Sequence, residues 1–189
     1  MADEAPVLAR HRRAVAGFDT VVDHVAGDTD CWTRPSPCAE WTARDVVDHV
    51  TGIHTVVAQR LDQPVTGSRG DGGDDVVARW RAARDAALRA LSQPGALDRE
   101  IDVPNGGLMA AGRFVNVITT DVLVHTWDLA RAVGVDAHLD ADLVKRAHEA
   151  AIPADELIRS SGMFGPRVEV GDDADPQSKM LAFFGRDPR

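Results

Sequence analysis

The fold class of this chain follows from residues 121–132, which read Asp121-Val-Leu-Val-His125-Thr-Trp-Asp128-Leu-Ala-Arg-Ala132. The segment predicts one amphipathic helix over about residues 111–133, ended by Gly134. At about 100° per residue, His125 falls inside the apolar stripe and Asp121 lies near its edge. An Asp and a His four residues apart project from the same helix face, so they form half of a divalent-metal site.

Burial of an imidazole or a carboxylate without a partner is costly, so another helix should supply a second His. The helix expected at 42–61 offers His49 and His54, which flank its apolar stripe on opposite sides. The first helix offers His11 and His24. Periodicity alone does not choose among these histidines.

Outward from this segment, the chain predicts a mainly all-α fold built on a four-helix bundle. Long helices are expected at about residues 6–26, 42–61, 76–91 and 111–133, and shorter ones at 140–151, 154–160 and 176–184. Short strands are expected at 101–103 and 168–170, a flexible connection at 64–75 and a turn at 104–107. Residues 1–136 would form the bundle with its metal site, and residues 137–189 a small C-terminal α/β cap packed on it within the same domain.

The composition excludes several classes of function. The chain has 189 residues and a net charge of -9, which argues against nucleic acid and anionic membranes as partners. No apolar run approaches the ~18 residues of a transmembrane helix, and the acidic N-terminus lacks the pattern of a signal peptide. We therefore expect a cytoplasmic protein whose two cysteines, Cys31 and Cys38, are free thiols.

Other polar residues near the motif have competing interpretations. Asp128 is a third ligand, an acceptor for the other ring nitrogen of a ligand, or a surface partner of Arg131. Asp45 is expected to cap the second helix together with Thr42, rather than to act as a base. Cys38 is expected to be a small buried residue rather than a metal ligand.

Two segments resemble the DinB-like metal-binding proteins of actinobacteria. They are Pro37-Cys-Ala-Glu-Trp-Thr-Ala-Arg-Asp-Val-Val-Asp-His49 and Asp121-Val-Leu-Val-His125-Thr-Trp-Asp-Leu-Ala-Arg-Ala-Val-Gly134. The tail Lys179-Met-Leu-Ala-Phe-Phe-Gly-Arg186 is similar too, although we expect Arg186 to form a surface ion pair rather than to contact a substrate. These proteins are similar to the N-terminal domain of mycothiol-dependent maleylpyruvate isomerase.

The resemblance implies a DinB-like four-helix bundle with His49, Asp121 and His125 as metal ligands, and leaves His54 as a bundle residue. Asp121 stands where the family often has Glu, so the shorter carboxylate is expected to bind directly or through water. Zn2+ suits this ligand set, and Ni2+ and Fe2+ share it. The chain is too short for the isomerase's additional C-terminal domain, so the isomerase reaction itself is not implied.

Three functions follow as hypotheses. The first is a thiol-dependent transferase or isomerase, in which the metal holds a small thiol such as mycothiol for attack on an electrophilic substrate. The second is a metal-dependent hydrolase that activates water, with Asp128 or Asp45 as its candidate base. The third is a non-catalytic metal-binding or stress protein. The sequence leaves both a monomer and a homodimer open.

Overall fold

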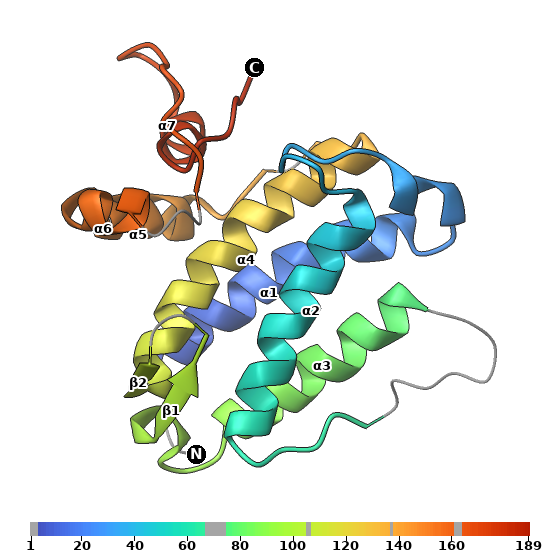
Figure 1. The fold of residues 1–189 in the computed structure, drawn as a ribbon, viewed down its shortest axis with the longest axis vertical. Helices are drawn as coiled ribbons and strands as arrows, with labels where there is room; N and C mark the ends of the chain where they lie inside the picture. Colours follow the sequence, from blue (N-terminus) through green and yellow to red (C-terminus); the bar gives the residue numbers. More distant parts are fainter. Residues whose placement is uncertain (1–3, 67–74, 105–106, 137, 161–163) are drawn as a thin grey trace.

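Four long helices form a bundle in this computed structural model, which describes residues 4–66, 75–104, 107–136, 138–160 and 164–189. They are α1 (Pro6–Val25), α2 (Ala43–Arg60), α3 (Val76–Leu91) and α4 (Ala111–Val133). Helix α2 packs against α3 and α4, and α1 packs against α4 (Figure 1). The predicted class, a mainly helical bundle, is confirmed.

Local sequence signals set the ends of these helices. Thr42 accepts from the backbone N–H of Asp45 while the Asp45 carboxylate accepts from the N–H of Thr42, which confirms the predicted capping box. Asp75 caps α3 by accepting two backbone N–H groups. Gly134 ends α4 in the left-handed region, at φ 81°, where a side chain would be strained.

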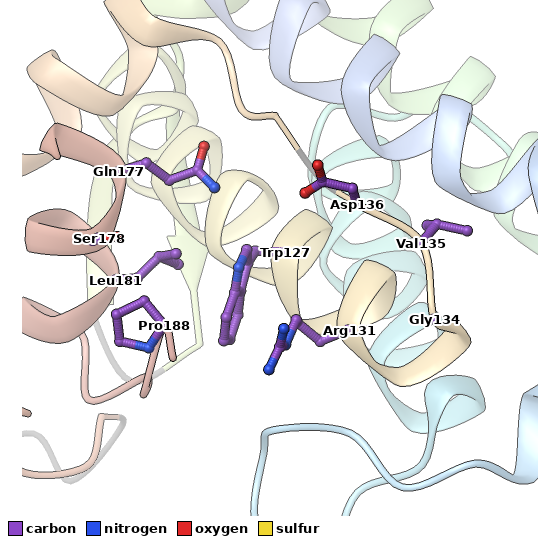
Figure 2. Close-up of a pocket in the computed structure, with 9 residues that line it drawn as sticks. All are labelled: Trp127, Arg131, Gly134, Val135, Asp136, Gln177, Ser178, Leu181 and Pro188. Atoms are coloured by element: carbon purple, nitrogen blue, oxygen red, sulfur yellow. The ribbon is translucent and has the colours of Figure 1, made fainter.

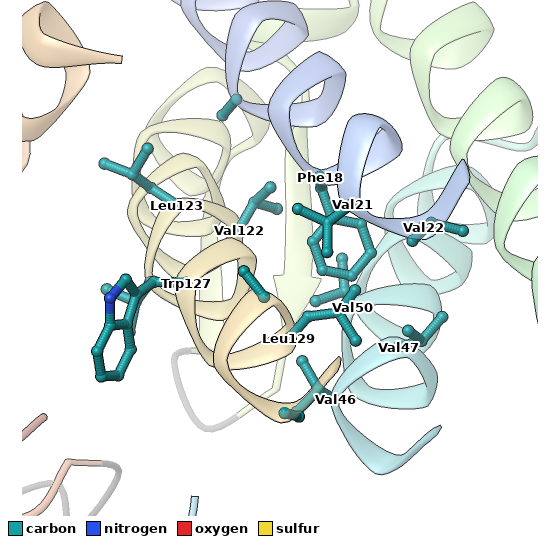
Figure 3. Packing of buried hydrophobic residues seen from close by; sticks show 14 of the residues in the cluster. Phe18, Val21, Val22, Val46, Val47, Val50, Val122, Leu123, Trp127 and Leu129 are labelled. Atoms are coloured by element: carbon teal, nitrogen blue, oxygen red, sulfur yellow. The ribbon is translucent and has the colours of Figure 1, made fainter. Parts of the chain in front are cut away.

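The core is made largely of small and branched aliphatic side chains. Figure 3 shows Phe18 of α1, Val50 of α2 and Leu129 of α4 meeting in its centre. All three side chains are fully buried. Because protein interiors are closely packed, a polar residue placed inside this core has few routes to water.

A small helical cap follows the bundle. It contains α5 (Ala141–Ala151), α6 (Asp155–Ser160) and α7 (Pro176–Phe183), and α5 packs against α7. Short 3-10 turns lie at Thr29–Thr33, Ala96–Asp98 and Ile152–Ala154. The division between residues 136 and 137 stays a prediction.

The two predicted strands have different outcomes. Strand β1 (Glu100–Val103) is present and pairs antiparallel with β2 (Gly107–Ala110), with Ile101 opposite Met109. The strand predicted at residues 168–170 is wrong: the described part of that segment is irregular, and the N–H of Val168 donates to the carbonyl of Ala182. The small sheet therefore belongs to the bundle, just before α4, rather than to the cap.

Some predicted loops are only partly visible. Residues 67–74 of the expected flexible connection and 105–106 of the expected turn lie outside the described residues. Within the described ranges, no helix has the length and apolar character needed to cross a membrane.

Two histidines lie side by side inside the bundle. The side chains of His11 on α1 and His54 on α2 are fully buried, with ring centroids 5.3 Å apart. The Nδ1 of His54 donates to the carbonyl of Val50 at 2.8 Å, and the Nδ1 of His11 hydrogen-bonds Thr119 Oγ1 at 3.1 Å. The Nε2 of each ring has no hydrogen-bond partner among the described residues. Both rings are therefore buried in the neutral form.

This pair should make the fold sensitive to acid. Burial lowers the pKa of His54 from 6.5 to about 4. An unfolded His binds its proton near pH 6.5, so the stability that the neutral ring contributes is complete above that pH and is lost as the pH falls toward 4. Between pH 7 and 5 we expect a loss on the order of 1–2 kcal/mol from this group.

Thermal unfolding of wild type and His54→Phe across this pH range tests the expectation. Phenylalanine keeps the ring contacts with Trp80 and cannot titrate, so the Tm of the variant should fall less on acidification. His24→Ala, at an exposed position, is the matched control and should follow the wild type. Parallel pH curves for wild type and His54→Phe would contradict a destabilising charge at this position.

Candidate metal centre

Two helices bring the predicted ligands together. His49 projects from α2, and Asp121 and His125 project from α4. The Nε2 of His49 lies 3.2 Å from Asp121 Oδ2, and the Nε2 of His125 lies 3.5 Å from Asp121 Oδ1. The three ligand atoms all lie within 4.8 Å of one another. The four-residue spacing puts Asp121 and His125 on one face of α4. In the bundle this face is turned toward α2.

This geometry fits a metal ion. Zinc bonds of about 2.0–2.1 Å in a tetrahedral arrangement put neighbouring ligand atoms roughly 3.3 Å apart. Asp121 Oδ1 lies 3.4 Å from His49 Nε2 and 3.5 Å from His125 Nε2, close to that value. The exposed fraction falls from 32% for the His49 side chain to 18% for Asp121 and 6% for His125, so the site is reached from the His49 side.

The charges of the trio are strongly coupled. Burial raises the pKa of Asp121, but the charges and hydrogen bonds of His125 and His49 lower it more, and the net pKa lies well below its usual range. Burial lowers the pKa of His125, but Asp121 and Asp128 raise it well above its usual value. The site therefore stabilises a positive charge beside the Asp121 carboxylate, and a proton on His125 competes with a bound cation.

Asp128 orients His125 from behind. Its fully buried carboxylate accepts a hydrogen bond from His125 Nδ1 at 2.9 Å. A carboxylate can only accept, so Nδ1 carries the proton and Nε2 is left as the nitrogen that faces Asp121. The interpretation of Asp128 as a surface partner of Arg131 is wrong, and its role as an acceptor for the second ring nitrogen matches the structure.

Arg186 completes this arrangement from the C-terminal tail. Its Nη2 lies 2.7 Å from Asp128 Oδ2, its Nε donates to Asp128 Oδ1 at 3.0 Å, and only 10% of its side chain is exposed. The predicted surface ion pair is therefore wrong, because the pair is buried. Hydrogen bonds from His125 and Arg186 outweigh burial and lower the pKa of Asp128. No local pattern links residues 58 positions apart, so sequence reasoning could not pair them.

Cys38 lies on the same side of His125. Its Sγ is 3.2 Å from Asp128 Oδ2 and 3.1 Å from Arg186 Nη2. Cys38, His125 and Asp128 thus form a second group with metal-ligand spacing. The guanidinium of Arg186 already supplies a cation to this group, so the site around Asp121 is the better candidate for a metal. Cys38 is half-buried and polar in its contacts, unlike the buried hydrophobe that was expected.

Trp41 forms a wall of the centre that sequence reasoning missed. Its ring stacks on His125 at 5.7 Å between centroids and lies 5.1 Å from the ring of His49. The signal available in the sequence was the position of Trp41 directly before Thr42, the N-cap of α2.

The remaining predicted candidates lie elsewhere. His54 and His11 form the separate buried pair, and His24 is exposed. Asp45 is engaged in its capping box, and Cys31 is a buried free thiol, 2.9 Å from the carbonyl of Asp28. The structure therefore brings His49, rather than the other histidines, to Asp121 and His125.

The fold and the site together define the class of this protein. It is a helical bundle in which facing helices bring two histidines and an aspartate to a candidate metal site. The family model of the mycothiol maleylpyruvate isomerase N-terminal domain matches residues 11–130, more than half of the chain. The chain belongs to this family.

Two relatives from Mycobacterium tuberculosis are similar over nearly the whole chain. Uncharacterized protein Rv0738 of strain ATCC 25618 / H37Rv is 32% identical over 187 residues, covering 97% of this chain and 99% of the relative. Uncharacterized protein MT0763 of strain CDC 1551 / Oshkosh matches with the same identity and coverage. No solved structure matches the chain.

The buried link from Arg186 should tune metal affinity. Arg186→Met leaves Asp128 without its cationic partner and should loosen the orientation of His125, so Zn2+ affinity should fall by about tenfold or more. Competition against a chromogenic chelator at neutral pH measures the change. Arg113→Met, at an exposed position on α4, is the control and should bind as the wild type does. Arg186→Lys, which keeps the charge, should recover part of the loss, and equal affinities for all four proteins would contradict the link.

Proposed function

We propose that this protein binds a divalent metal through His49, Asp121 and His125 and uses it in thiol-dependent transferase or isomerase chemistry, with mycothiol as the thiol. The convergence of these three side chains from α2 and α4 carries the proposal. Three protein ligands leave coordination positions for a small molecule, as in catalytic zinc sites. Zinc suits two imidazoles and one carboxylate, and nickel and iron share this preference.

The state of the nearby carboxylates favours a thiol over water as the nucleophile. A hydrolase needs a base to accept the proton of water, and the sequence offered Asp128 and Asp45 for that role. Asp128 is fully buried and held by His125 and Arg186, and Asp45 is held by Thr42. When bound, the metal lowers the pKa of a thiol and holds it as the nucleophilic thiolate without a separate strong base.

The chain's own residues then orient and shield the reacting groups. Asp128 holds the ring of His125, so that Nε2 faces Asp121. Trp41 covers one face of His125 and borders His49, which restricts water and leaves a flat apolar surface beside the open side of the centre. Figure 1 places α2 and α4, which carry the three ligands, side by side, as their contacts require. An electrophile would approach along this surface.

Metal content tests the ligand assignment. Freshly purified wild type should carry about one equivalent of divalent metal, whereas His49→Ala and His125→Ala should carry little, because two ligands hold zinc weakly. His24→Ala, a substitution on an exposed part of α1, should retain the metal. Circular dichroism shows whether each variant is folded. Equal metal in all four folded proteins would refute the site.

X-ray absorption of the zinc-loaded protein tests the role of the thiol separately from metal binding. With mycothiol present, the spectrum should gain a sulfur neighbour at about 2.3 Å, the length of a zinc–thiolate bond. The free cysteine Cys38 is excluded as the source by repeating the measurement with Cys38→Ser. A metal that is bound but gains no sulfur would contradict the thiol role while leaving the metal site intact. Turnover of esters without any thiol would instead favour the hydrolase.

A further inference from the structure

Two ring nitrogens in the core of the bundle differ from the polar groups nearer the surface. Figure 2 shows the pocket between the end of α4 and α7, with Arg131 and Gln177 in its wall. Arg131 donates to the backbone carbonyl of Arg189, and Gln177 accepts a backbone N–H from the start of the cap. In the core, by contrast, the Nε2 atoms of His11 and His54 are buried and have no partner among the described residues.

The hydrogen bonds at Nδ1 fix which nitrogen of each ring carries the proton. The carbonyl of Val50 can only accept, so Nδ1 of His54 is the protonated nitrogen. The hydroxyl of Thr119 donates its one hydrogen to the carbonyl of Val115 at 2.6 Å, so it accepts from Nδ1 of His11. A neutral imidazole has a single N–H. Both Nε2 atoms therefore present a bare lone pair inside the core.

The two rings lie close enough to share one ion. Their centroids are 5.3 Å apart. With metal–nitrogen bonds of about 2 Å, the centres of two imidazoles on one ion lie roughly 5–6 Å apart. The rings come from α1 and α2, which each pack against α3 and α4. An ion held by both rings would therefore lie inside the bundle, away from solvent.

The surroundings of the pair select the charge of such an ion. The rings of Phe18 and Trp80 are fully buried, and Trp80 lies 4.9 Å from the ring of His54. Neither histidine of the pair forms an ion pair within the described ranges. The cost of burying charge rises steeply with its size, so neutral ligands in an apolar core disfavour a divalent ion.

A proton is a poorer occupant of this site than a two-coordinate metal ion. Burial lowers the pKa of both His11 and His54. A proton would satisfy one lone pair and leave the other without a partner, whereas one ion engages both. The negative charge of Asp121 raises the pKa of His54, although burial lowers it more, so this carboxylate favours a cation near the ring.

We propose that His11 and His54 form a second metal site, which binds one Cu(I) ion through their two Nε2 atoms. Imidazole is a good ligand for copper, and the monovalent ion is satisfied by two ligands, whereas zinc requires four. The hydrogen bonds at Nδ1 hold both rings in the tautomer that a metal needs. This site shares no residue with the centre formed by His49, Asp121 and His125 and does not depend on its function.

Nuclear magnetic resonance of the imidazole nitrogens tests the site in the wild type. Long-range ¹H–¹⁵N spectra of zinc-loaded, ¹⁵N-labelled full chain at neutral pH should show His11 and His54 as Nδ1–H tautomers, assigned with the single Phe variants. One equivalent of Cu(I) should then shift both Nε2 signals together, because one ion binds both rings. A proton on either Nε2, or a shift confined to His49 and His125, would overturn the proposal.

Competition against bicinchoninate under argon measures the affinity. Zinc-loaded wild type should withdraw one equivalent of Cu(I) from this chelator, with the reading taken once the absorbance is constant. His11→Phe and His54→Phe each remove one ligand but keep a ring, and they should bind Cu(I) at least about tenfold more weakly. His24→Ala, at an exposed position, is the matched control and should bind as the wild type does. Circular dichroism shows whether each variant is folded.

X-ray absorption at the copper edge separates this site from the cysteines. The spectrum should show two nitrogen neighbours and no sulfur, and Cys31→Ala and Cys38→Ser should leave it unchanged. A sulfur neighbour, a wild type that takes up no Cu(I), or undiminished uptake by folded His54→Phe would each contradict the site. Zinc content measured in the same samples distinguishes failure of this site from failure of the centre at His49.

Discussion

The buried carboxylate of Asp128 is the constraint on which the rest of the centre depends. A charge with no access to water is tolerated in a protein interior only when oppositely charged donors surround it. Asp128 receives them from His125, one turn back on the same helix, and from Arg186 in the tail. These bonds fix the ring of His125 and attach the tail to α4. One buried group thus joins the geometry of the candidate metal site to the packing of the cap.

The bundle around it is well suited to hold polar groups in place. Its interior is dominated by valine, alanine and leucine, which pack closely and leave side chains little freedom. Into this core the helices bring two separate polar clusters: the trio of His49, Asp121 and His125 near one end, and the stacked pair of His11 and His54. The first contains a carboxylate and stabilises a protonated ring, whereas the second contains none and keeps its rings neutral. The carboxylates of Asp121 and Asp128 beside His125 account for the difference.

Much of this could be predicted from the sequence, because helices leave local signals. Periodicity and caps placed the four long helices, and the i, i+4 spacing put Asp121 and His125 on one face. Helical periodicity could not choose between His49 and His54, because both flank the apolar stripe of α2. The resemblance to the family selected His49. The alternation of Val168-Glu-Val170 suggested a strand, but a strand requires a partner, and the N–H of Val168 bonds to the end of α7 instead. The prediction for Arg186 was wrong and Trp41 was missed, because the contacts of both residues depend on how distant segments pack.

The attachment of the tail also has a consequence for the order in which the protein is made. Asp128 leaves the ribosome 58 residues before Arg186, the residue that neutralises it. During that interval α4 carries a carboxylate whose cationic partner does not yet exist, so the nascent bundle must keep that face hydrated or rely on His125 alone. The final docking of the tail is therefore the event that dries this side of the centre. The complete set of contacts around Asp128 therefore requires the C-terminal segment as well as the four helices.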